Sequence, residues 1–194
     1  MNVLLGISEI IDENNIKINY REAVRAIIMQ DNKILLVHSN LGDYIFPGGG
    51  VEKNETHAEG LIREVAEETG YLNCVIKNKM GVVVERYIDE YDENAIFQMT
   101  SHYYFCELNG EKTAQKLEGY ELEQGYTPQW VKLGDAINQN EKIINQCERN
   151  WWIHRENYVL KELEKMNLLY KRKSRGYEAK KHGRDFRFRG EDLR

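Results

Sequence analysis

Residues 48–71, GGGVEKNETHAEGLIREVAEETGY, join a run of three glycines to a helical pattern. Small and apolar side chains recur after Thr56 at the i, i+3, i+4, i+7, i+8 and i+11 positions that define one face of an α-helix. These residues are Ala58, Leu61, Ile62, Val65, Ala66 and Thr69. Thr56 suits the N-cap, and Gly70 suits the left-handed residue that follows a helix. The stretch therefore predicts a flexible loop that leads directly into one amphipathic helix.

Acidic side chains gather on another face of the same predicted helix. Glu64, Glu67 and Glu68 occupy positions i, i+3 and i+4, so their carboxylates lie close together and repel one another. Full hydration or a bound cation would relieve that repulsion, and oxygen ligands in this number suit Mg²⁺ or Mn²⁺ rather than zinc. Arg63 and Glu55 lie beside this face, where a bidentate ion pair could brace the glycine loop against the helix. Because glycines permit close backbone approach, a loop carbonyl could reach the same ion.

The spacing between Gly49 and Tyr71 resembles the Nudix box, Gly-x5-Glu-x7-Arg-Glu-U-x-Glu-Glu-x-Gly-U, in which U is a bulky apolar residue. The matching residues are Gly49, Glu55, Arg63, Glu64, Val65, Glu67, Glu68 and Gly70. Tyr71 is aromatic where an aliphatic residue is usual, a departure that concerns packing at the helix end and not metal binding. A looser resemblance extends over residues 20–166.

The resemblance implies an α/β fold, a Nudix-type α/β/α sandwich around a mixed β-sheet. Members of the family hydrolyse the pyrophosphate linkage of a nucleoside diphosphate joined to another group, with Mg²⁺ or Mn²⁺ as cofactor. The implied metal ligands are the Gly48 carbonyl and the carboxylates of Glu64, Glu67 and Glu68.

The resemblance also implies the residues that would orient and accept protons. Glu55 and Arg63 would form the orienting ion pair. The proton of the attacking water would pass to Glu67, Glu68 or a carboxylate of a late loop, for which Glu123 is the first candidate and Glu121 the alternative. Surface glutamates without a role are the other interpretation of that loop.

The rest of the chain predicts strands first, one helix, more strands and closing helices, as in one mixed α/β domain. A hairpin turns at Asp31-Asn32 between residues 21–30 and 33–38. The other predicted strands are 44–46, 80–87, 97–108 and 129–133, and the closing helices are 135–140 and 151–166. We expect a Nudix domain over residues 1–170, with its core at about 20–166, and a basic tail over residues 171–194.

Composition excludes several classes of protein. The chain has 194 residues, 41% of them hydrophobic and 30% charged, as is typical of a globular domain. The predicted tail carries ten basic and four acidic residues, so the remainder is strongly acidic and unsuited to bind DNA. No apolar run approaches the ~20 residues that span a membrane, and the first residues lack the features of a signal peptide. With three widely spaced cysteines, Cys74, Cys106 and Cys147, the sequence indicates a cytoplasmic protein with reduced thiols.

Substrate contacts are less clearly indicated. Arg25 and Arg86 are candidates to bind phosphate, and Tyr44 and Tyr103 to stack on a base, with surface charge and core packing as the respective alternatives. Many ADP-ribose hydrolases of the family carry a proline about 15 residues after the box; the absence of proline between Tyr71 and Pro128 argues against that substrate. A nucleotide sugar or a nucleoside triphosphate fits the pattern.

Two other functions stay open at this stage. A non-catalytic module of this family could sense a nucleotide without hydrolysing it. The basic tail, in which aromatic residues alternate with arginines, could contact RNA and make a capped RNA 5′ end the substrate. The tail could instead pack on the acidic body of a second copy, which would give a homodimer.

Overall fold

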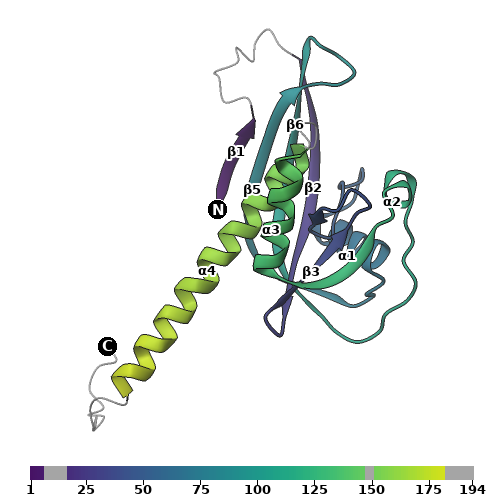
Figure 1. Cartoon of the computed structure of the whole chain (residues 1–194). Helices are drawn as coiled ribbons and strands as arrows, with labels where there is room; N and C mark the ends of the chain where they lie inside the picture. The colour runs from purple at the N-terminus through teal and green to yellow at the C-terminus, as the bar shows by residue number, and fades with distance from the viewer. Residues whose placement is uncertain (7–16, 147–150, 182–194) are drawn as a thin grey trace, which may run out of the picture.

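A mixed sheet of seven strands forms the centre of the computed structural model, which describes residues 1–6, 17–146 and 151–181 (Figure 1). The strand order is β1-β5-β6-β2-β3-β4, and β7 pairs with β3. The strands are β1 (Asn2–Gly6), β2 (Lys17–Gln30), β3 (Lys33–His38), β4 (Tyr44–Ile45), β5 (Cys74–Ile88), β6 (Ala95–Leu108) and β7 (Thr127–Lys132). The pairs β1·β5 and β2·β6 are parallel and the others antiparallel, so the predicted mixed sheet is confirmed.

The predicted hairpin joins β2 to β3. Asp31 and Asn32 have φ angles of 50° and 61°, the left-handed conformations that two-residue hairpin turns require. Asn and Asp adopt this conformation at a lower cost than other side chains. The turn therefore sets the antiparallel register in which Met29 faces Ile34.

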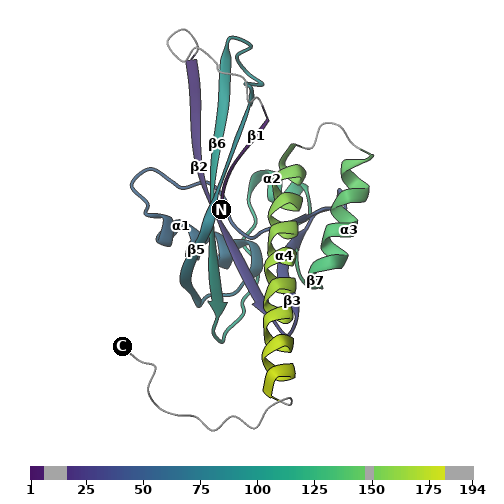
Figure 2. The ribbon, with the colours of Figure 1, turned by 90° about the vertical axis from the view of Figure 1, so that its left-hand side faces the viewer.

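Helices cover both faces of the sheet, as the predicted sandwich requires (Figure 2). Helix α1 (His57–Thr69) lies on one face, and α3 (Leu133–Ile144) and α4 (Trp151–Lys181) lie on the other. Alternating side chains of β2 supply both layers of the core: Val24 and Ala26 pack with Leu61 of α1, and Ile27 packs with Leu160 of α4.

The structure departs from expectation in three elements. Strand β1, which was not predicted, pairs along the edge of β5, and the five-residue helix α2 (Gly119–Glu123) lies where a late loop was predicted. Helix α4 continues to Lys181, 15 residues beyond the predicted end, through a segment rich in Lys and Arg, which favour helix. The expected domain boundary at residue 170 therefore falls inside a helix, and residues 182–194 of the predicted tail lie outside the described residues.

Two further expectations concern thiols and membrane segments. Cys74 and Cys106 are buried free thiols, as predicted, while Cys147 lies outside the described residues. Within the part of the chain that the structure describes, no helix has the length and apolar character needed to cross a membrane.

Candidate active site

Helix α1 begins and ends at well-formed caps. The Thr56 hydroxyl accepts the backbone N–H of Glu59, and the Glu59 carboxylate accepts the backbone N–H of Thr56, which completes a capping box. At the other end, Gly70 has a φ of 78° and donates its N–H to the Ala66 carbonyl. These caps fix the register in which the helix presents its acidic face.

The glycine loop approaches β2 and α1 so closely that side chains would collide. The Val24 N–H donates to the Gly49 carbonyl over 2.9 Å, which aligns the loop with β2. Gly48 has a φ of 138°, and a Cβ there would lie 2.0 Å from the Val24 carbonyl oxygen. A Cβ on Gly49 would lie 2.4 Å from the Glu64 carboxylate. Glycine is therefore required at Gly48, where the loop meets the backbone of β2, whereas at Gly49 the collision is with a side-chain end of α1 that sits in the site.

Arg63 and Glu55 form the bidentate pair that the sequence predicts. Arg63 Nε and Nη2 donate to the two Glu55 carboxylate oxygens over 2.8 and 2.9 Å, and Nη2 also reaches the Gly50 carbonyl at 3.2 Å. Arg63 Nη1 donates to Glu64 over 2.9 Å and to Glu67 over 3.1 Å. The hydrogen bond from Arg63 lowers the pKa of Glu55, and its bonds to these carboxylates raise the pKa of Arg63. The pair ties the loop to the helix.

Three carboxylates meet next to this pair. Oxygens of Glu64, Glu68 and Glu121 lie within 4.8 Å of one another. Glu68 is only 1% exposed and accepts the Gly48 N–H over 2.7 Å, and Glu64 is 7% exposed. Burial is the main cause that raises the pKa of all three, and the charge of Glu64 further raises those of Glu68 and Glu121. Arg63 and Arg25 offset part of the repulsion at Glu64, and Arg25 offsets part of it at Glu68, yet the pKa values of both carboxylates stay raised. A largely buried cluster of oxygen donors of this kind fits a hard divalent cation such as Mg²⁺ or Mn²⁺.

A cleft beside the glycine loop carries positive and aromatic side chains. Arg25 is buried, and its guanidinium donates to the Gly48 carbonyl while its Nε has no hydrogen-bond partner among the described residues. Arg21 lies over Gly50. The cleft is lined by Arg21, Arg25, Arg155, Tyr87, Tyr120, Tyr126 and Trp152, among others.

Arg155 forms the buried end of this cleft. It donates to Glu156 over 2.9 and 2.7 Å and also to Glu85, and the Glu156 carboxylate accepts the Phe46 N–H over 2.9 Å. Burial alone would lower the pKa of Arg155, but Glu156 and Glu85 raise it well above its usual value. The three groups form an ionic network that joins α4 to β5 and, through the Phe46 N–H, to the residue that follows β4.

The family model described as a NUDIX domain matches residues 19–151 of the chain. The chain belongs to the Nudix family. An ADP-ribose pyrophosphatase of Methanocaldococcus jannaschii is 45% identical over 64 residues, which cover 31% of this chain and 37% of that protein. A diphosphoinositol polyphosphate phosphohydrolase of Homo sapiens is 29% identical over 143 residues, 72% of this chain and 65% of that protein. The matches thus span less than two thirds of these Nudix relatives.

A solved structure shares the fold. The NUDIX hydrolase from Nitrosomonas europaea superposes with a TM-score of 0.52 at 19% identity, over 73% of this chain and 89% of that one. At this identity the likeness concerns the fold alone, and it agrees with the Nudix sandwich described above.

Several residues predicted for the Nudix site lie together. Glu55, Arg63, Glu64 and Glu68 surround the glycine loop, and Arg25 lines the cleft. Glu67 is more exposed on α1. Its carboxylate bonds Arg63 and is not one of the three that converge. The Gly48 carbonyl, expected as a metal ligand, accepts a hydrogen bond from Arg25.

Other predicted residues lie elsewhere. Glu123 is exposed on α2, and the carboxylate that joins the cluster belongs to the alternative, Glu121. Tyr103 is fully buried, 5.4 Å from the Phe46 ring in an edge-to-face contact, so it packs in the core instead of stacking on a base. Tyr44 packs against the core on the α3–α4 side of the sheet, and its hydroxyl bonds Gln129. Arg86 bonds Gln98 and lies on the face of β5 opposite the cleft residue Tyr87.

Four residues of the cleft were not predicted from the sequence: Tyr120, Tyr126, Trp152 and Arg155. Tyr120 neighbours Glu121, so the late-loop assignment could have suggested it. Arg155 and Trp152 come from α4, whose apolar pattern predicts a helix but not the face that meets the cleft.

Proposed function

We propose that this protein hydrolyses the pyrophosphate linkage of a nucleoside diphosphate joined to another group, with Mg²⁺ or Mn²⁺ as cofactor. The observation that carries the proposal is the convergence of Glu64, Glu68 and Glu121 beside a cleft that holds Arg21 and Arg25. Carboxylates that bind a cation, next to arginines that bind phosphate, form the arrangement that phosphoryl transfer needs. The substrate would be a nucleotide-derived small molecule of the cytoplasm.

The metal would be held by Glu64, Glu68 and Glu121. The Gly48 carbonyl would join them if Arg25 moves from it to a phosphate group of the substrate. When bound, such an ion neutralises phosphate charge and lowers the pKa of a coordinated water.

The other residues of the site would bind and orient the substrate. The unsatisfied Nε of Arg25 and the guanidinium of Arg21 would bind phosphate oxygens. Tyr120, which is 49% exposed at the cleft, offers an aromatic face to the nucleobase. Glu67 would accept the proton of the attacking water, since Arg63 holds its carboxylate beside the cluster and leaves it solvent-accessible.

A turnover panel tests this function. The panel contains ADP-ribose, sugar nucleotides, nucleoside triphosphates, dinucleoside polyphosphates and 5′-triphosphate RNA, each with Mg²⁺ or Mn²⁺. ADP-ribose belongs in it because of the similarity to the archaeal pyrophosphatase, despite the missing proline. Glu68→Gln serves as the inactive variant and Glu123→Gln as the matched control.

We expect metal-dependent hydrolysis of one substrate class by the native protein and by Glu123→Gln, and its loss in Glu68→Gln. No turnover of any substrate, together with a nucleotide-induced rise in the melting temperature, would favour the nucleotide-sensing module and refute the proposed hydrolysis.

A further inference from the structure

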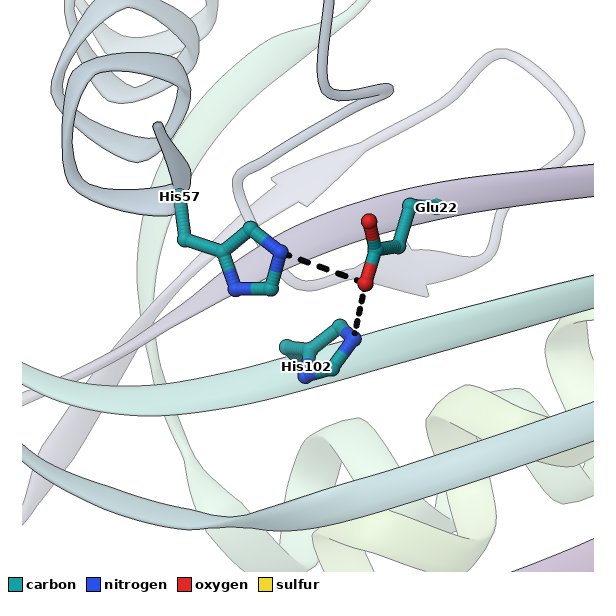
Figure 3. Close-up of side chains that lie close together, drawn as sticks. All are labelled: Glu22, His57 and His102. Carbon is teal, nitrogen blue, oxygen red and sulfur yellow. Dashed lines mark hydrogen bonds and ion pairs between the residues drawn. The ribbon is translucent and has the colours of Figure 1, made fainter. Parts of the chain in front are cut away.

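A second group of potential metal ligands lies on the α1 face of the sheet (Figure 3). Glu22 comes from β2, His57 is the first residue of α1, and His102 comes from β6. Both imidazole rings direct Nε2 toward Glu22 Oε1, at 3.3 Å from His57 and 3.0 Å from His102. The three donor atoms lie within 4.8 Å of one another.

This histidine cluster is separate from the acidic cluster of Glu64, Glu68 and Glu121. His57 precedes Glu64 by two helical turns, about 10 Å along the axis. Glu22 occupies the face of β2 opposite the cleft residues Arg21 and Arg25, because successive side chains of a strand alternate. The proposed hydrolysis therefore does not involve the histidine cluster.

The spacing of the donor atoms suits a small transition-metal ion. Ligands about 2.1 Å from a tetrahedral ion are roughly 3.4 Å apart. The separations of 3.0 and 3.3 Å between each Nε2 and the shared oxygen need only small movements to reach that value. Two imidazoles and one carboxylate, with further positions open to water, are a ligand set that Zn²⁺ and its neighbours in the first transition row accept.

We propose that Glu22, His57 and His102 bind a divalent transition-metal ion of the Zn²⁺ type. The backbone already holds two of the ligands in place, since the Glu22 carbonyl accepts the Val51 N–H over 3.0 Å and the capping box fixes the start of α1 next to His57. His57 Nδ1 lies 2.9 Å from the Tyr104 hydroxyl. A proton on Nδ1 donated to that hydroxyl leaves the Nε2 lone pair free for the metal.

Lys79 competes with the metal. Its ammonium group lies 2.7 Å from His102 Nδ1, and an ammonium can only donate, so the Nε2 of His102 then carries the proton. Metal binding at Nε2 requires this ammonium to leave Nδ1. The Lys79 side chain is exposed, and it already lies 5.6 Å from the centre of the Tyr104 ring, over which it can remain. Metal binding thus breaks only the contact between the flexible Lys79 side chain and His102.

The bound ion would join three elements. It would tie the start of α1 to β2 and β6 and stabilise the folded chain, since a ligand that binds only the native state raises the melting temperature.

Calorimetric titration of Zn²⁺ into the untagged full-length protein, with Mg²⁺ in excess to saturate the acidic cluster, tests the site. We expect one Zn²⁺ per chain, and an affinity at least ~10-fold lower in His57→Ala and in Glu22→Gln. His154→Ala, which removes an exposed histidine of α4, is the matched control and should bind as the native protein does. Co²⁺ should give a visible absorption spectrum that His57→Ala alters.

Two results would overturn the proposal. One is the absence of stoichiometric Zn²⁺ binding by the native protein. The other is unchanged binding in His57→Ala and Glu22→Gln with loss in a Glu64→Gln, Glu68→Gln double variant, which would place the Zn²⁺ in the acidic cluster. Glu22→Gln should fold normally, because Glu22 is exposed and Gln has the same shape. Its melting temperature checks this, so Glu22→Gln still tests the site if His57→Ala is unstable.

Discussion

The acidic cluster and the histidine cluster each bring three donor atoms within 4.8 Å, but they differ in chemistry and in burial. Glu68 and Glu64 are almost fully buried and offer only oxygen, whereas the histidine cluster mixes nitrogen with one oxygen and includes the exposed Glu22. Oxygen donors favour Mg²⁺, and imidazoles favour Zn²⁺. If both clusters bind metal as proposed, they should therefore select different ions.

The largest difference between the clusters should appear in catalysis. Glu68→Gln removes the charge of the most buried carboxylate of the acidic cluster, so we expect turnover to fall by at least ~10²-fold, as for loss of a metal ligand. Removal of divalent ions by a chelator should abolish turnover of the native protein. Steady-state kinetics on the substrate found in the panel measures both effects.

His57→Ala is the matched change in the histidine cluster. With Mg²⁺ present, its turnover should stay within about twofold of the native value because His57 lies two helical turns from Glu64. An equal loss in both variants would show that the two clusters act as one site.

The next largest effect should separate two neighbouring glutamates of α2. Glu121→Gln removes the third oxygen ligand and should lower turnover by about tenfold, while Glu123→Gln should leave it unchanged. The two substitutions have the same chemistry and lie on the same five-residue helix. Glu121 also accepts the Glu118 N–H in the capping box of α2, and Gln can take the same N3 position, so the start of the helix should be kept. A larger loss in Glu123→Gln would restore the original assignment from the sequence.

The acidic cluster could be largely predicted from the sequence, because two of its residues and the glycine loop lie within one continuous motif. Glu121 could only be placed in a short list, since α2 is too short to show helical periodicity. The bond of Glu67 to Arg63, beside the acidic cluster but outside its three converging carboxylates, depends on contacts that spacing alone does not reveal.

The histidine cluster could not be predicted from the sequence. Glu22 and His102 are 80 residues apart and become neighbours only through the parallel register of β2 and β6, in which Val24 pairs with His102. The fold shows the same contrast: the hairpin and α1 follow from local turn and capping residues, whereas β1 depends on its distant partner β5. Arg155 likewise reaches the cleft only because α4 packs across the sheet.

A smaller effect should follow from Gly49→Ala. The new Cβ would lie 2.4 Å from the Glu64 carboxylate, which must then move from its position beside Glu68. We expect the affinity for Mg²⁺ to fall several-fold, the affinity for Zn²⁺ to stay unchanged, and the melting temperature to change little because a side-chain end can adjust. Calorimetry with each ion measures the two affinities, and an equal change in both would contradict the independence of the clusters.

The smallest effect, and the most specific to the histidine cluster, concerns Lys79. Lys79→Met keeps much of the length of the side chain but removes the ammonium that occupies His102 Nδ1 and that repels a nearby cation. Zn²⁺ affinity should therefore rise several-fold, while Mg²⁺-dependent turnover stays at the native value. Lys77→Met, two residues away on the same strand, is the control, because Lys77 pairs with Glu107 and not with the histidines. A fall in Zn²⁺ affinity in Lys79→Met would mean that Lys79 supports the histidine cluster, and the exchange of lysine for metal would then be wrong.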